Sequence, residues 1–166
     1  MRTMVAASFA IRQFREEDLP SVFELVYNTI DIAYNEVYPP EAIDYFKEYH
    51  SERIILEDAA AGYTLVAECG GQIVGTGTLL GVNVRRVFIS PQHQHRGIGR
   101  SIAQRLEAEA RRGRSTTIDL AASLVSLQFW ESLGFTAVGE YFVPVKYGKK
   151  LRYYQMEKYL ETADNL

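Results

Sequence analysis

Residues 89–112, ISPQHQHRGIGRSIAQRLEAEARR, join an apolar run to a helical run through Gly97 and Gly99. Apolar residues recur at three- and four-residue spacing from residue 98 to residue 110, which predicts a helix with one buried face. The run NVRRVFIS that precedes it is typical of a strand. A strand that leads through glycines into a helix favours anion binding, because the first N–H groups of a helix have no partner within it.

The loop between this strand and this helix is open to three interpretations. His93 and His95 lie two residues apart, but a zinc site needs three or four ligands and no second cysteine or acidic residue stands at a suitable spacing, so we predict no metal. Phosphate binding is the second interpretation, since Gly97 and Gly99 would let a phosphate approach the main chain. A polar turn with two convenient glycines is the third. The spacing is neither that of a dinucleotide-binding Gly-x-Gly-x-x-Gly motif nor that of a P-loop.

The composition is that of one ordinary globular domain. A chain of 166 residues suits a single domain over residues 1–166, and its 47% apolar content can supply a core. The net charge of −3 gives no reason to expect a nucleic-acid partner, and no apolar run is long enough to suggest a membrane span. The lone Cys69 excludes an internal disulfide and suits a reducing compartment, so we expect a cytoplasmic protein.

Alternating and helical patterns predict an α/β fold with a mixed sheet. The strand, helix and strand between residues 83 and 121 should form a crossover that joins two parallel strands. The expected strands cover residues 8–14, 63–69, 72–81, 83–90 and 115–121, with two more around a turn at Gly148 within 135–160. The expected helices cover residues 16–34, 38–52, 97–112 and 123–133.

Two motifs in order identify a family resemblance. QHRGIG, residues 94–99, matches Gln-x-x-Gly-x-Gly after a strand that ends in VFISP. SLVSLQFWESLGF, residues 123–135, matches an Asn/Ser-x-x-Ala-x-x-Phe-Tyr-x-x-x-Gly-Phe run, with Ser126 at the alanine and Trp130 at the tyrosine. Together they resemble the pyrophosphate loop and the second signature of the GNAT superfamily of N-acetyltransferases. The resemblance implies a single-domain fold with a mixed central sheet of about seven strands flanked by about four helices.

The resemblance implies acetyl-CoA as the co-substrate, held mainly by the backbone. The strand residues before the loop would pair with the pantetheine arm, and the loop and helix start would hold the pyrophosphate. Ser123 stands where the family commonly has an asparagine that touches the cofactor, although it could instead cap the helix that we expect to begin there. The implied cofactor-binding residues are Val87, Phe88, Ile89, His95, Arg96, Gly97, Ile98, Gly99, Arg100 and Ser123.

Acetyl transfer from a thioester to an amine requires a deprotonated amine and a stabilised or protonated thiolate. The family usually protonates the thiolate with the tyrosine whose place Trp130 takes, and an indole N–H cannot deliver a proton at neutral pH. Tyr141 is our candidate acid, with Tyr147, Tyr153 and Tyr154 as alternatives. Packing is an equally open role for each of them, and the thiolate could leave without an acid.

The general base is also open. Some family members carry a carboxylate near the position of Asn83, so Asp119 on the following strand is our candidate base, ahead of Glu36 and Glu68. A water relay to a distant carboxylate, or no dedicated base, is an alternative.

The acceptor site is expected along residues 27–49, which form one wall of it in the family. Tyr27, Tyr34 and Tyr38 are candidate lining residues, although the helical spacing of Tyr27 and Tyr34 also suits packing. Arg85 and Arg86 are neighbours on a strand and should point to opposite faces. One of them, for which we name Arg85, could bind a substrate carboxylate or phosphate, or else form a salt bridge to Asp119 or Glu68.

The leading hypothesis is therefore an acetyl-CoA-dependent N-acetyltransferase that acts on a primary amine of a small molecule or peptide. Transfer would occur by direct attack in a ternary complex. The alternative is an acyl-CoA-binding module of the same fold with little or no turnover, motivated by Trp130 and by the missing carboxylate near Asn83. A homodimer is a further expectation, because dimers are frequent in the family.

Overall fold

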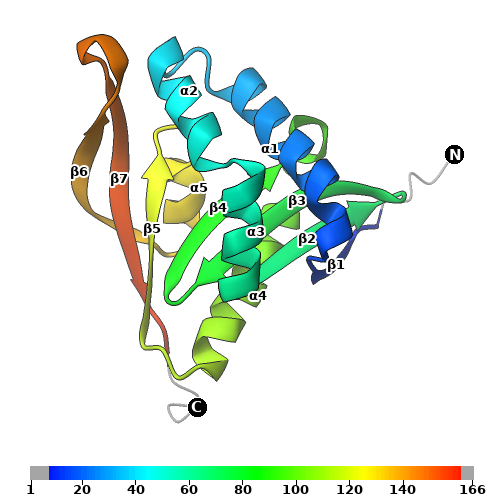
Figure 1. Cartoon of the computed structure of the whole chain (residues 1–166). Coiled ribbons are helices and arrows are strands. Elements are labelled where there is room, and N and C mark those ends of the chain that lie inside the picture. Colours follow the sequence, from blue (N-terminus) through cyan, green and yellow to red (C-terminus); the bar gives the residue numbers. More distant parts are fainter. Residues whose placement is uncertain (1–7, 162–166) are drawn as a thin grey trace, which may run out of the picture.

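The computed structural model describes residues 8–161, which form a seven-stranded mixed sheet with helices on both faces (Figure 1). The strand order is β1-β2-β3-β4-β5-β7-β6, which confirms the predicted fold class. The strands are β1 (Ala10–Gln13), β2 (Tyr63–Cys69), β3 (Gln72–Leu80), β4 (Asn83–Ile89), β5 (Thr117–Ser123), β6 (Thr136–Pro144) and β7 (Lys150–Tyr159). The helices are α1 (Leu19–Ala33), α2 (Pro40–Tyr49), α3 (Glu52–Ala61), α4 (Ile98–Arg112) and α5 (Leu127–Ser132).

The helix α3 is the largest departure from the prediction, which ended the second helix at residue 52 and left residues 53–61 without structure. The helix α2 ends at His50. Ser51 then caps a new helix, because its hydroxyl accepts a hydrogen bond from the N–H of Ile54 at 3.3 Å. The helix α5 is shorter than predicted, since Ser123 belongs to β5 and the helix begins only at Leu127.

The strands β4 and β5 run parallel and are joined through α4, as predicted. They pair only at Asn83 and Asp119, although each strand has seven residues. Every other neighbouring pair in the sheet is antiparallel and has a register of four or more residue pairs. The carboxyl ends of β4 and β5 therefore diverge, and the backbone of β4 beyond residue 83 has no ladder on that side.

A bulge in β4 changes the direction of the two arginines. Phe88 pairs with Thr76 and Arg85 with Thr78, so two residues of β4 lie opposite the single Gly77 of β3. Arg86, one of those two, has a φ of +54°, which is rare for a residue other than glycine. The expectation that the arginines point to opposite faces is therefore wrong, because alternation fails at the bulge and both guanidinium groups reach Asp58.

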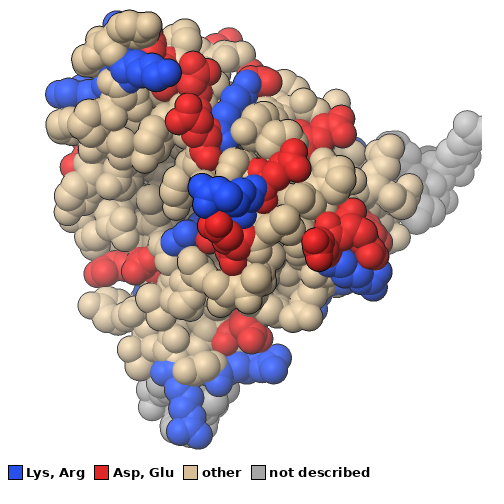
Figure 2. All heavy atoms as spheres, in the orientation of Figure 1, with Lys and Arg blue, Asp and Glu red and all other residues tan. Residues whose placement is uncertain are grey.

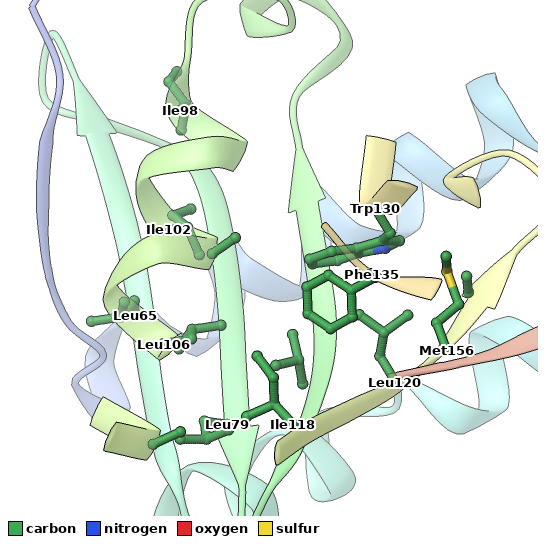
Figure 3. Packing of buried hydrophobic residues seen from close by; sticks show 14 of the residues in the cluster. Leu65, Leu79, Ile98, Ile102, Leu106, Ile118, Leu120, Trp130, Phe135 and Met156 are labelled. Carbon is green, nitrogen blue, oxygen red and sulfur yellow. The ribbon is translucent and has the colours of Figure 1, made fainter. Parts of the chain in front are cut away.

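Two apolar clusters hold the layers together. Figure 3 shows the first, in which Ile102 and Leu106 of α4 lie against the sheet and Trp130 packs beside Phe135. Gly77 lets α4 approach, because a Cβ atom there would lie 2.6 Å from a methyl group of Ile102. The second cluster packs α1, α2 and α3 against the opposite face of the sheet (Figure 1). The two layers leave the diverging ends of β4 and β5 as the opening in the sheet.

Candidate active site

A cleft of about 300 Å³ lies where β4 and β5 diverge. One wall comes from β4, residues 83–88, and another from Leu120, Ala121 and Ser123 of β5. The helix α2 and the β6–β7 hairpin supply aromatic and aliphatic side chains, and Trp130 of α5 also lines the cleft. A concave site with a mainly apolar lining and a few polar groups is the usual form of a small-molecule site.

The start of α4 presents free N–H groups just beyond the carboxyl end of β4. The N–H of Ser101 bonds to the carbonyl of Gly97 at 3.0 Å, so the helix itself has no carbonyl for the N–H groups of Ile98, Gly99 and Arg100. Gly97 caps the helix with a φ of +84°, and a Cβ atom there would meet nothing within 4 Å. The geometry suits an anion at the helix start.

Gly99 lies in the first turn of α4, against the side chain of Phe129. A Cβ atom at Gly99 would lie 3.1 Å from the ring of Phe129, so this glycine allows α4 and α5 to pack closely. His95, Arg96 and Arg100 are exposed around the loop. Gln94 closes the loop, since its side-chain amide donates a hydrogen bond to the carbonyl of Ile89 at 3.1 Å.

A buried cluster of charge lies at the α2–α3 end of the cleft. The Nη2 of Arg86 donates to Asp58 at 2.9 Å and its Nε donates to Nδ1 of His50 at 3.0 Å. The Nη1 of Arg85 lies 3.5 Å from the same carboxylate of Asp58. Burial, followed by the charges of Arg86 and Arg85, lowers the pKa of His50 to about 3. His50 is therefore neutral at physiological pH and accepts a hydrogen bond without adding charge.

Burial is also the main effect on Arg86, whose pKa it lowers, while the hydrogen bond and charge of Asp58 act in the opposite direction. Neither Asp58 nor His50 was singled out from the sequence. His50 lies in a run of polar residues, 47–53, that matches no motif. The contact between Asp58 and Arg86 forms only because α3 packs beside the bulge of β4.

Residues 34–160 match the family model described as an acetyltransferase (GNAT) domain. The chain belongs to the GNAT acetyltransferase family. This match confirms the family resemblance inferred from the two motifs. Comparison with curated proteins gave no match.

Solved structures of GNAT proteins share the fold. A GCN5-related N-acetyltransferase from Rhodopseudomonas palustris is 22% identical, with a TM-score of 0.85 over 95% of this chain and 99% of that one. The PaiA N-acetyltransferase from Thermoplasma acidophilum, in complex with coenzyme A, is 19% identical, with a TM-score of 0.76 over 92% and 99%. YncA from Salmonella typhimurium, with its cofactor acetyl-CoA, is 21% identical, with a TM-score of 0.65 over 93% and 95%.

In this GNAT protein Ser123 is the last residue of β5 and lines the cleft. Its hydroxyl accepts from the N–H of Ser126 at 3.2 Å and lies 3.3 Å from the hydroxyl of Tyr34. It does not cap α5, because Ser126 occupies that position. Tyr34 is buried and lines the cleft, and burial raises its pKa, so its phenol stays protonated at neutral pH.

The candidate acids are distributed unevenly around the cleft. Trp130 is buried against the rings of Phe129 and Phe135 and lines the cleft. Tyr141 does not line it. Its ring stacks on Tyr153 at 5.9 Å and its side chain is half exposed on the edge strand β6. Tyr153 is the one residue among the four tyrosines named from the tail that lines the cleft in the described structure.

The candidate bases lie outside the cleft lining. Asp119 accepts a hydrogen bond from the Nδ2 of Asn83 at 2.7 Å, so it reaches the cleft through Asn83. Glu68 forms a salt bridge with Arg12 at 2.7 Å, and Glu36 is exposed. No aspartate or glutamate lines the cleft within residues 8–161.

Of the three tyrosines expected in the acceptor wall, Tyr27, Tyr34 and Tyr38, only Tyr34 lines the cleft. Tyr38 is buried, and its hydroxyl donates to the carbonyl of Arg152 at 2.7 Å. Tyr27 packs on Phe23 at a ring distance of 4.1 Å and donates its hydroxyl to the carbonyl of Lys47 at 2.7 Å, so it ties α1 to α2. Arg85 lines the cleft, and its partner is Asp58 rather than the expected Asp119 or Glu68.

Other features of the described residues bear on partners. They contain no group of three or more histidine, cysteine or acidic side chains arranged to hold a metal ion. None of the described helices is both long and apolar enough to span a bilayer. Figure 2 shows acidic and basic side chains interspersed over one face of the protein.

Proposed function

We propose that this acetyltransferase transfers an acetyl group from acetyl-CoA to a primary amine of a small molecule or peptide, by direct attack in a ternary complex. The observation that carries this proposal is the cleft between the diverging ends of β4 and β5, with the start of α4 beside it. The similarity in fold to structures that contain coenzyme A or acetyl-CoA supports it.

The residues present fit acetyl-CoA. The backbone of Val87, Phe88 and Ile89 has no strand partner on the side of β5, so it is available to the pantetheine amides. The free N–H groups at the start of α4 suit the pyrophosphate, and the open space beside Gly97 admits it. When bound, acetyl-CoA supplies an activated acyl group and a thiolate leaving group.

The cleft favours an uncharged amine as the nucleophile. Two arginines line it and no carboxylate does within the described residues, so a protonated ammonium would gain no ion pair there. We propose that the acceptor loses its proton to water as it enters, and that Asp119, which accepts a hydrogen bond from Asn83, contributes only its negative charge from outside the cleft. A dedicated base in contact with the amine is not required by this arrangement.

The geometry favours Tyr34 over Tyr141 as the group that hydrogen-bonds the departing thiolate. Tyr34 lines the cleft beside Ser123, and its protonated hydroxyl can donate, whereas Tyr141 does not line the cleft. Trp130 can donate a hydrogen bond from its indole N–H but cannot supply a proton. We therefore assign the tyrosine function of the family to Tyr34, which directly follows α1, rather than to a residue of α5.

A release assay for free thiol, with acetyl-CoA and amines of several classes, tests the proposed transfer. Thiol release that depends on the amine, together with a mass increase of one acetyl group on that amine, is the expected result. Binding of coenzyme A without transfer to any amine would favour the second candidate, an acyl-CoA-binding module, which Trp130 and the absence of a lining carboxylate suggest. A cytoplasmic location and a homodimer stay predictions.

A further inference from the structure

The acceptor end of the cleft carries an uncompensated positive charge. Arg85 and Arg86 share the single carboxylate of Asp58, and their partner His50 is neutral. Asp119 reaches the cluster only through Asn83, which accepts from the Nε of Arg85 at 2.9 Å. The cluster of two guanidinium groups and one carboxylate therefore has an excess of one positive charge.

The Arg86 part of this cluster is buried, and a buried charge that shares its counter-ion is unfavourable unless a further anion joins the cluster. The side chain of Arg86 is only 2% exposed, and its Nη1 has no hydrogen-bond partner among the described residues. Arg86 also adopts the positive φ of the bulge, where a residue other than glycine is under backbone strain. Strained residues cluster at functional sites, and a buried donor without a partner calls for an explanation, so Arg86 is a candidate for a functional role in this cleft.

Arg85 is the arginine that a ligand can reach. Its side chain is 24% exposed, and it lines the cleft next to Arg86. The planar guanidinium group presents several donors, which suits a carboxylate. The buried Arg86 adds to the positive electrostatic potential at this end of the cleft without contacting the ligand.

We propose that Arg85 and Arg86 form an anion subsite that binds the carboxylate of an amino-acid-like acceptor, and this inference rests on the proposed function. The walls beside the arginines are apolar or aromatic, so the body of the acceptor should be apolar as well. A volume of about 300 Å³ suits a small amine rather than a long peptide. The side chains of these walls are Tyr45, Phe46, Tyr49, Val143, Leu151 and Tyr153.

Matched acceptors test the subsite. Each set contains an aromatic, aliphatic or ω-amino acid, its carboxamide, and the corresponding amine without the carboxyl group. The kcat/KM is measured by thiol release and corrected for the free-base fraction of each amine. The Arg85→Gln variant removes the charge but leaves the Arg86–Asp58 pair, and Arg85→Lys retains the charge. Arg53→Gln on α3 is the matched control, because that side chain is 74% exposed and does not line the cleft.

We expect the wild type to favour at least one carboxylate acceptor over its carboxamide by about tenfold or more, since hydrogen bonds to charged groups contribute that much. Arg85→Gln should abolish most of this preference, Arg85→Lys should retain part of it, and Arg53→Gln should retain all of it. A wild type that prefers no carboxylate, or a preference that survives in Arg85→Gln or disappears equally in Arg53→Gln, overturns the subsite.

Absence of thiol release with every acceptor would refute the proposed transfer, and a binding measurement then decides the subsite separately. Calorimetry compares N-acetyl amino acids with their carboxamides on the wild type and on Arg85→Gln, each saturated with coenzyme A. Selective binding of the carboxylate that is lost in Arg85→Gln supports the subsite. Equal binding of the two compounds, or no binding of either, overturns it.

Discussion

Replacing Gly97 with alanine separates the backbone role of the α4 cap from its role in binding acetyl-CoA. The residue has a φ of +84°, so an alanine there is strained and should lower the free energy of unfolding by about 1–2 kcal/mol. The new methyl group would point into space that is empty within 4 Å, where we place the pyrophosphate. Loss of one hydrogen bond to a charged group raises the Kd for coenzyme A by about tenfold or more.

Gly81 provides a matched control at the other end of β4. It lies in the turn between β3 and β4, has a φ of +62°, and a Cβ atom there would also meet nothing within 4 Å. Gly81→Ala should therefore have the same strain and a similar loss of stability but an unchanged Kd. Urea unfolding measures the first quantity, and calorimetry with coenzyme A measures the second. An unchanged Kd in Gly97→Ala, or an equal rise in Gly81→Ala, would refute the placement of the pyrophosphate.

Individual contacts give three further predictions. In Gly99→Ala, crowding against Phe129 should offset the roughly 1 kcal/mol that alanine gains over glycine in a helix, so Phe129→Leu should lower the melting temperature less in the Gly99→Ala background than in the wild type. Equal losses in the two backgrounds would contradict the packing role. Because the pKa of His50 is lowered to about 3 in the folded protein, the unfolded chain binds a proton first as the pH falls below 6.5. The free energy of unfolding should therefore be lower by about 2 kcal/mol at pH 5 than at pH 7. Urea unfolding at pH 7 and pH 5 should show a smaller loss in His50→Gln, and equal losses would exclude His50 as the cause. Tyr34→Phe should lower kcat about tenfold or more with little change in the Kd for coenzyme A, while Tyr141→Phe keeps kcat, and the reverse pattern would return the acid to Tyr141.

The sequence was sufficient for the parts of the fold that depend on local patterns. The helix from residue 98 to residue 112 follows from its apolar spacing, and the parallel crossover from β4 to β5 follows from the order of elements. The break at His50 and the separate helix α3 were missed, because the predicted helix was extended past Ser51 to residue 52 and its serine was not recognised as the cap of a new helix. The bulge at Arg86 was missed for a different reason, since no residue there favours a positive φ.

The two halves of the cleft differ in how far a motif can specify them. The cofactor half uses backbone groups, which a short pattern such as QHRGIG fixes because glycine spacing controls backbone approach. The acceptor half uses side chains from α2, α3 and β4 that are distant in sequence, and the carboxylate of Asp58 reaches Arg85 and Arg86 only after folding. Membership of the GNAT family therefore predicts which cofactor binds but not which acceptor. Substitutions around Gly97 should change the rate for every amine alike, whereas substitutions at Arg85 should change the order in which amines are preferred.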